Sequence, residues 1–247
     1  MFMEITKFKK LSSGRYKVTL DNNDSFIVYE DLILKYNLLI TKSIDADLIT
    51  KLEEENMSYS AYYYAINSLN SRFKSKYDME KTLKNKYDID INPIINKLLE
   101  QGYLNDISYT KSRINEDIIT TNWGPRKIKS DLLKHGIEND IIDNELIIFT
   151  KELEIERIDK IVNKLLKSNK SRGGYVLRTK IFNDLMNLGY TKEYINIVLN
   201  DKNYDNSDIY KKEYDKLLKK YSKKYSGNEL DYRVKQALYQ KGLYYEE

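Results

Sequence analysis

The sequence predicts a mainly α fold, in which tandem three-helix, helix-turn-helix-like repeats form an elongated curved array after a small N-terminal β-hairpin segment. Two observations lead to this prediction. A pattern of one aliphatic residue, one leucine and one glycine recurs at a spacing of 53 residues. In addition, β-branched and aromatic residues concentrate in the first 50 residues, between clusters of turn-forming residues.

The first 50 residues differ in pattern from the rest of the chain. Residues 15–20 and 25–29 are rich in β-branched and aromatic side chains, and the Asp and Asn residues between them favour a tight turn, so together they predict a hairpin. A further strand is expected over residues 5–11, and a short helix over residues 30–37. We therefore assign residues 1–50 to a β-rich N-terminal cap.

The helical part of the chain is organised by a repeated pattern around Leu132, Leu185 and Leu238. Each leucine has an aliphatic residue four positions earlier, which places both on one helix face. Each also has a glycine four positions later, which suits the left-handed residue that ends a helix. The aliphatic residues are Ile128, Ile181 and Val234, and the glycines are Gly136, Gly189 and Gly242.

Capping signals set the ends of the helices. Ser75 is an expected N-cap with Asp78 at the third helical position, an acidic variant of the capping box. Gly124 takes the place of Ser75 in the next repeat, followed by Pro125 at the first helical position. The predicted helices are 59–72, 76–86 and 93–101; 106–120, 125–135 and 139–149; 152–168, 175–188 and 192–200; 208–226 and 228–241. The predicted units are 58–104, 105–150 and 151–201, with a partial fourth repeat over 207–247.

The composition argues against an ordinary enzyme. The 247 residues include no cysteine and one histidine, which excludes a disulfide framework, a thiol nucleophile and most multi-histidine metal sites. No phosphate-binding loop, dinucleotide motif, nucleophile elbow or His-Glu-x-x-His motif is present. His135 is expected at a helix C-terminus, interacting with the helix dipole. We therefore expect no catalytic residue, no metal site and no cofactor.

Membrane association is not expected either. The N-terminus has no apolar signal region, and the longest apolar stretch, residues 32–40, contains Lys35 and is far shorter than the roughly 20 residues that span a bilayer. The sequence thus predicts a cytoplasmic protein.

Basic residues are unevenly distributed. Residues 1–150 carry 21 basic and 23 acidic side chains, whereas residues 151–247 carry 21 basic and 15 acidic ones, which together give the net charge of +4. Many basic residues fall on the second helix of a repeat or on the turn before it, where contact with a phosphate backbone or an acidic protein groove is expected. They are Arg72, Lys74, Arg126, Lys127, Lys129, Lys134, Arg172, Arg178, Lys180, Arg233 and Lys235.

The third helices of the repeats raise an alternative. A helix-turn-helix transcription regulator would insert its third helix into a DNA groove, bind a palindromic operator and dimerise. The third helix of the second repeat is acidic, with Glu138, Asp140, Asp143 and Glu145, which phosphates would repel. A carboxylate-dependent nuclease is a third and weaker alternative, since no obvious pair of carboxylates is present.

Three motifs in order give a resemblance to a known family. They are R-x-x-S-x-x-D-M-x-x-x-L over residues 72–83, G-Y-L-N-D over 102–106, and G-P-x-x-I-x-x-D-L-x-x-x-G-I over 124–137. Together with residues 15–38, they resemble the RecX family of recombination regulators, in particular its longer, Gram-positive-type members. The chain departs mildly from the family pattern: Tyr109-Thr110 replaces a common Phe-Ala, and Asp78 and Asp131 replace Glu.

The resemblance implies a fold of tandem three-helix repeats and a protein partner. It implies binding in the groove of the RecA recombinase filament on single-stranded DNA, with suppression of its ATPase, strand-exchange and co-protease activities in recombination and the SOS response. Direct contact with single- or double-stranded DNA is implied as a secondary property. We accordingly expect a monomeric, non-enzymatic regulator of this filament.

Overall fold

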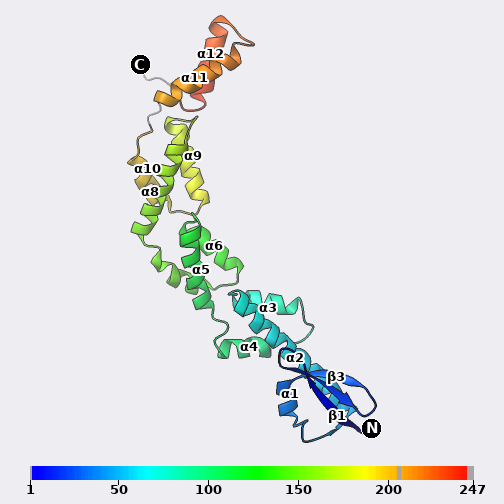
Figure 1. The fold of residues 1–247 in the computed structure, drawn as a ribbon. Helices are drawn as coiled ribbons and strands as arrows, with labels where there is room; N and C mark the ends of the chain where they lie inside the picture. The colour runs from blue at the N-terminus through cyan, green and yellow to red at the C-terminus, as the bar shows by residue number, and fades with distance from the viewer. Residues whose placement is uncertain (1, 205–206, 244–247) are drawn as a thin grey trace. The chain divides into compact units, whose positions relative to one another are not determined.

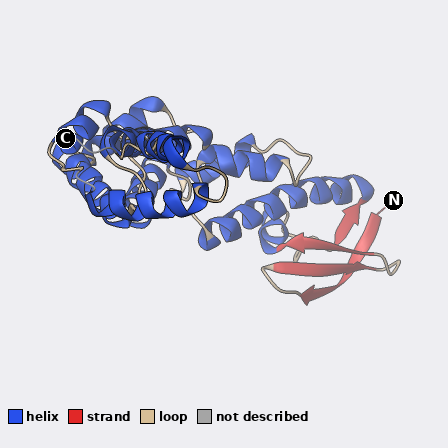
Figure 2. Cartoon of the chain, turned by 90° about the horizontal axis from the view of Figure 1, so that it is seen from above, coloured by secondary structure: helices blue, strands red, loops and turns tan. Residues whose placement is uncertain are grey.

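The computed structural model describes residues 2–204 and 207–243, which are mostly helical, with strands confined to the N-terminal part (Figures 1 and 2). The chain forms two compact units. Unit 1 comprises Met1–Tyr109 with His135–Ile137, and unit 2 comprises Thr110–Lys134 with Glu138–Glu247. The predicted fold class, helical repeats after a small antiparallel β segment, is confirmed. No described helix is long and apolar enough to cross a membrane.

A four-stranded antiparallel sheet begins unit 1, in the order β3-β2-β1-β4. The predicted hairpin is β2 (Arg15–Leu20) and β3 (Ser25–Tyr29), and the further strand is β1 (Phe2–Lys10). The sequence did not predict β4 (Ser43–Asp45), which pairs with the start of β1. Its three residues are too short for an alternating pattern, although Ile44 is buried.

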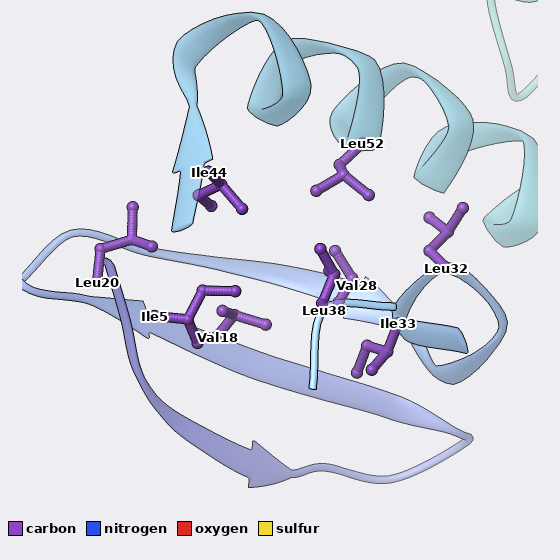
Figure 3. Packing of buried hydrophobic residues seen from close by; sticks show 9 residues of the cluster. All are labelled: Ile5, Val18, Leu20, Val28, Leu32, Ile33, Leu38, Ile44 and Leu52. Carbon is purple, nitrogen blue, oxygen red and sulfur yellow. The ribbon is translucent and has the colours of Figure 1, made fainter. Parts of the chain in front are cut away.

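One face of the sheet is covered by α1 (Glu30–Lys35) and by the first half of α2 (Ala46–Ser71). In Figure 3, Leu52 of α2 points toward the residues of the sheet, and Leu32 of α1 belongs to the same buried cluster. The full cluster is Ile5, Val18, Leu20, Val28, Leu32, Ile33, Leu38, Ile44 and Leu52.

The predicted start of the first long helix at residue 59 is wrong. The helix α2 begins at Ala46, where the Asp45 carboxylate accepts a hydrogen bond from Leu48 N at 2.8 Å, and it contains no glycine or proline before its end. Residues 50–58 are therefore helix and not a connection. The same helix covers the sheet with its first half and enters the first repeat with its second.

The first repeat combines the second half of α2 with α3 (Lys76–Lys84) and α4 (Asn92–Glu100). The Ser75 side chain caps α3 as predicted, accepting a hydrogen bond from Asp78 N. The α4 helix starts one residue before the predicted Pro93, with Ile91 at the cap. Two alanines of α2 allow the aliphatic side chains of α3 and α4 to pack closely: Ala61 and Ala65 share a core with Met79, Leu83, Ile91, Ile94, Ile95, Leu98 and Leu104.

The remaining helices follow the predicted three-helix order, and most ends agree within one or two residues. The exceptions are the seventh helix, which gives way to a 3-10 turn, and the eleventh, which ends five residues early. The elements are α5 (Asp106–Thr120), α6 (Pro125–Lys134), α7 (Asn139–Glu145), η1 (Leu146–Ile148), α8 (Lys151–Ser168), α9 (Gly174–Asn187), α10 (Lys192–Asn200), α11 (Ser207–Tyr221) and α12 (Gly227–Tyr239).

In unit 2 the end of α9 packs against the start of α6 through a glycine. Gly189 has φ +84°, and a Cβ on it would overlap Lys127 N. Gly124 N donates a hydrogen bond to Leu188 O at 2.7 Å, and Arg126 N donates to Gly189 O at 3.1 Å. The last carbonyls of one second helix are thus bonded to the first N–H groups of another, which pairs groups that would otherwise lack intrahelical partners.

We call this arrangement the glycine junction, and it occurs again at the other two repeating glycines. Gly242 leaves no room for a Cβ against Gly173 O, and Gly173 N donates to Lys241 O at 2.9 Å. In unit 1, Gly136 is in contact with the Tyr77 side chain, and Ser75 Oγ donates to the carbonyl of the residue before that glycine at 2.7 Å. The repeating glycine therefore ends a helix, as predicted, and also permits close approach to another repeat.

A half-buried arginine fixes α8 to the end of α5. Arg157 Nη1 donates to Ile118 O at 2.6 Å, and Nη2 donates to Thr121 O at 2.8 Å. On the same helix, the Glu154 carboxylate accepts from the backbone N–H of Thr191 at 2.5 Å, at the start of α10. Arg157 therefore places a positive charge at the C-terminus of α5, where the partial charge of the helix is negative. Glu154 places a negative charge at the N-terminus of α10, where the partial charge is positive.

Replacing Gly189 by alanine tests the glycine junction. Gly189→Ala should lower the free energy of unfolding by about 3 kcal/mol, from left-handed backbone strain and the overlap with Lys127. Gly227→Ala is the matched control, because its φ is +57° and nothing lies within 4 Å of the added Cβ. It should cost only about 1 kcal/mol, from strain alone. Equal losses in urea denaturation would contradict a packing role for Gly189.

The pH dependence of unit 2 should depend on Glu213 of α11. Its carboxylate accepts a hydrogen bond from Lys241, and this lowers the pKa of Glu213 below its ordinary value of 4.5 despite burial. A lowered carboxyl pKa adds stability above the unfolded pKa, and that stability is lost as pH falls through the folded pKa.

Accordingly, Glu213→Gln should cost about 2 kcal/mol at neutral pH and weaken the decline in stability below about pH 4.5. Glu229→Gln, which removes an exposed pair with Arg233 at 3.6 Å, should change little. Urea denaturation at several pH values measures both variants. An unchanged pH profile for Glu213→Gln would show that the pair with Lys241 adds no stability.

Candidate functional site

Four of the eleven predicted site residues are exposed cations whose side chains make no hydrogen bond or ion pair with any described residue: Arg72, Arg126, Lys134 and Arg172. The three arginines lie near the starts of second helices in three successive repeats. Arg72 follows α2 and precedes α3, Arg126 lies in the first turn of α6, and Arg172 directly precedes the N-cap of α9.

Each of these arginines is close in sequence to a glycine junction. Arg126 is itself bonded through its backbone N–H to Gly189, and the neighbour of Arg172, Gly173, is bonded to Lys241. Ser75, three residues after Arg72, donates to His135 O. The junctions therefore hold the backbone from which the three free guanidinium groups extend.

The other seven predicted site residues already have partners. Four of them are in ion pairs, which reduces the positive charge that they offer a ligand, whereas Lys74, Lys127 and Arg178 contact neutral groups. The Lys235 pKa, for example, is raised by its hydrogen bond with Asp231. The contacts are Lys74 with Thr82 at 3.1 Å, Lys127 over the Trp123 ring at 5.0 Å, Lys129 with Asp143 at 2.5 Å, Arg178 with Asn200 at 2.9 Å, Lys180 with Asp184 at 2.6 Å, Arg233 with Glu229 at 3.6 Å and Lys235 with Asp231 at 2.9 Å.

The structure brings Arg72 and Lys74 together in one pocket of unit 1, with a volume of about 330 Å³. A third cation, Lys81 of α3, also lines it, although it was not among the predicted site residues. The complete lining is Arg72, Phe73, Lys74, Asp78, Lys81, Thr82, Asn85, Tyr109 and His135.

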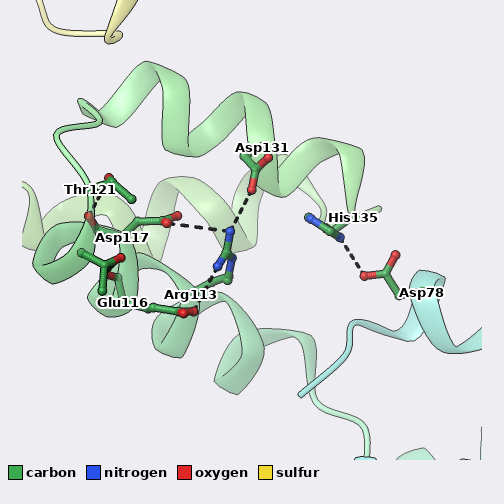
Figure 4. Close-up of polar contacts among 8 residues, drawn as sticks. Asp78, Arg113, Glu116, Asp117, Thr121, Asp131 and His135 are labelled. Carbon is green, nitrogen blue, oxygen red and sulfur yellow. Dashed lines mark hydrogen bonds and ion pairs between the residues drawn. The ribbon is translucent and has the colours of Figure 1, made fainter. Parts of the chain in front are cut away.

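His135 lies in the wall of this pocket. Its Nδ1 is 2.7 Å from Asp78 Oδ2, as Figure 4 shows, and its ring lies edge-on to Tyr109 at 6.1 Å between centroids. The sequence predicted a helix-end position for His135 but not its partner, because the two residues are 57 positions apart. The Asp78 carboxylate therefore contacts His135. In the predicted capping box it would instead have contacted the start of its own helix.

A second polar cluster centres on Arg113 of α5 and was also missed by sequence reasoning. Figure 4 shows its guanidinium facing three carboxylates: Glu116 at 3.0 Å, Asp131 at 3.2 Å and Asp117 at 3.7 Å. Burial raises the pKa of the Asp117 carboxyl, although the charge of Arg113 opposes this. Because Asp131 belongs to α6, this cluster ties α5 to α6 and has the character of a structural network.

The third helix of the second repeat does not provide a basic surface for reading DNA. In the second repeat, α7 spans only seven residues, and Glu138, Asp140 and Asp143 around it are exposed. Asp143 also neutralises Lys129, one of the predicted site residues. These acids would repel the phosphates that flank a DNA groove. Over residues 2–204 and 207–243, no group of three or more His, Asp or Glu side chains could hold a metal ion.

Comparison with known proteins identifies relatives along nearly the whole chain, although no family model matches it. The regulatory protein RecX of Listeria monocytogenes serotype 4a is 27% identical over 254 residues, covering 99% of this chain and 94% of the relative. The regulatory protein RecX of Bacillus velezensis is 28% identical over 249 residues, covering 97% and 94%.

Solved structures agree with this relationship. A crystal structure of regulatory protein RecX matches with a TM-score of 0.70 at 24% identity, covering 81% of this chain and 100% of that one. RecX from Lactobacillus salivarius matches with a TM-score of 0.56 at 26% identity, covering 60% and 97%. The resemblance inferred from the motifs is confirmed: the chain is similar over nearly its whole length to regulatory proteins named RecX.

Proposed function

We propose that this chain is a non-enzymatic regulator that binds the RecA filament on single-stranded DNA and lowers its ATPase, strand-exchange and co-protease activities. The regulatory role follows from the names of its relatives, whereas the filament and the direction of the effect are our proposal. The observation that carries it is the recurrence of a free, exposed arginine near the start of the second helix in three successive repeats.

A recurring cation favours a partner that is itself repetitive. Each repeat offers one arginine that no carboxylate neutralises, so the chain has several equivalent points of contact with phosphates or with acidic protein side chains. A small ligand would use one such point, whereas a filament can use all of them. The paired lysines elsewhere on the second helices are expected to contribute less, because their charge is already balanced.

The ATPase of the cognate recombinase tests the proposal. The full-length chain should lower the rate of ATP hydrolysis that RecA shows on single-stranded DNA, and the effect should increase with chain concentration until it saturates. The rate is measured at fixed DNA and recombinase concentrations. An unchanged rate at saturating chain would contradict the proposed inhibition.

Removing the three free arginines together tests the proposed surface. The triple variant Arg72→Ala, Arg126→Ala, Arg172→Ala should bind the filament about tenfold more weakly and lower the salt slope of log affinity by about 2, given roughly 0.7 per phosphate contact on a single strand. The matched control is Lys160→Gln, Lys180→Gln, Lys235→Gln, which removes three cations that sit in intrahelical ion pairs. Equal effects of the two variants would mean that net charge, and not position, controls binding.

A further inference from the structure

The pocket between α3 and His135 carries more positive than negative charge. Arg72, Lys74 and Lys81 line it, against the single carboxylate of Asp78. That carboxylate is in contact with His135 Nδ1 at 2.7 Å. This contact occupies one of the two Asp78 carboxylate oxygens. The pocket therefore presents a net cationic surface to an incoming anion.

One cation of the pocket is held in place by its neighbours. Lys74 Nζ donates to Thr82 Oγ1 at 3.1 Å, and Thr82 Oγ1 in turn donates to Asp78 O at 2.7 Å. An ammonium group has three donors, so Lys74 keeps others for a ligand. Arg72 has no side-chain partner among the described residues and can bind a phosphate through two parallel hydrogen bonds.

An exposed phenyl ring lies between the two cations in sequence and also lines the pocket. Phe73 is 68% exposed, whereas the aliphatic residues of α3 beside it are buried. Exposed aromatic rings flanked by cations are the stacking surfaces that proteins use for bases of single-stranded nucleic acids. An acidic peptide would use the cations but leave the ring without a planar partner, so the combination favours a nucleotide.

We propose that this pocket holds one nucleotide of a single-stranded DNA. Its phosphate oxygens accept hydrogen bonds from Arg72, Lys74 and Lys81, and its base stacks on Phe73. The volume of about 330 Å³ lies at the lower end of the range of small-ligand sites and suits one nucleotide. The assignment deepens the proposed function and rests on it, since it names DNA as what this part of the basic surface contacts.

Fluorescence anisotropy of a labelled oligothymidylate, with the full-length chain and no recombinase, tests the pocket. Phe73→Ala should weaken binding by about tenfold, in line with the loss of one base–aromatic stack, and Phe73→Trp should restore it. Phe2→Ala is the matched control, because Phe2 is 73% exposed and lies on β1 away from the pocket lining. Its affinity should equal that of the unmodified chain.

A second pair of variants separates position from charge. Lys81→Gln should weaken oligothymidylate binding and lower the salt slope by about 0.7, whereas Lys84→Gln, on the same helix but outside the pocket lining, should do neither. Equal affinities of Phe73→Ala and the unmodified chain, or no binding of oligothymidylate by the unmodified chain, would overturn the nucleotide assignment. Loss of filament binding by Phe73→Ala with unchanged DNA affinity would overturn it in favour of a protein contact.

The recombinase ATPase, measured separately with the unmodified chain, reports on the proposed function alone. If the unmodified chain inhibits the recombinase but Phe73→Ala binds oligothymidylate with unchanged affinity, the nucleotide pocket is rejected and the proposed regulatory function is retained. If anisotropy confirms the stack on Phe73 but the unmodified chain has no effect on the recombinase, the proposed target is rejected and the single-stranded DNA site is retained.

Discussion

The arrangement of the second helices depends on one constraint, the absence of a side chain at the glycine that ends three of them, α6, α9 and α12. At Gly189 and Gly242 the backbone lies so close to the start of another helix that a Cβ would overlap it. Backbone hydrogen bonds connect the two segments at each of these positions. Glycine satisfies two demands at these positions, since it also adopts the left-handed conformation without strain. The need for glycine at these contacts explains why glycine recurs in the sequence at a spacing of 53 residues.

The junction connects packing to the candidate site because it fixes the backbone beside the free arginines. Arg126 is bonded through its own N–H, and Arg172 and Arg72 lie one and three residues from a bonded group. Side chains at such positions start from a rigid backbone, which lowers the entropy lost when they bind. Cations further along the second helices, such as Lys180 and Lys235, instead satisfy carboxylates one turn away.

Much of the fold could be predicted from local signals, and the site only in part. Ser75 and Pro125 mark helix starts that the structure reproduces, because capping acts within a few residues. The start of α2 at Ala46 was missed, although Asp45 is a favourable N-cap residue and no glycine or proline interrupts residues 46–58. The contact of Asp78 with His135 joins two repeats, so no local pattern reveals it. The sequence shows where basic residues are concentrated, but it does not show that seven of the eleven predicted site residues already contact other side chains.

We propose that the arginines near the junctions, and not the third helices, contact the filament. A structure of the chain bound to its cognate recombinase on single-stranded DNA, determined by electron cryo-microscopy, tests it most directly. This mode of binding would place the guanidinium groups of Arg72, Arg126 and Arg172 within hydrogen-bonding distance of phosphate or carboxylate oxygens of the filament. It would be contradicted by a complex in which α4, α7 and α10 make the contact and these three side chains face solvent.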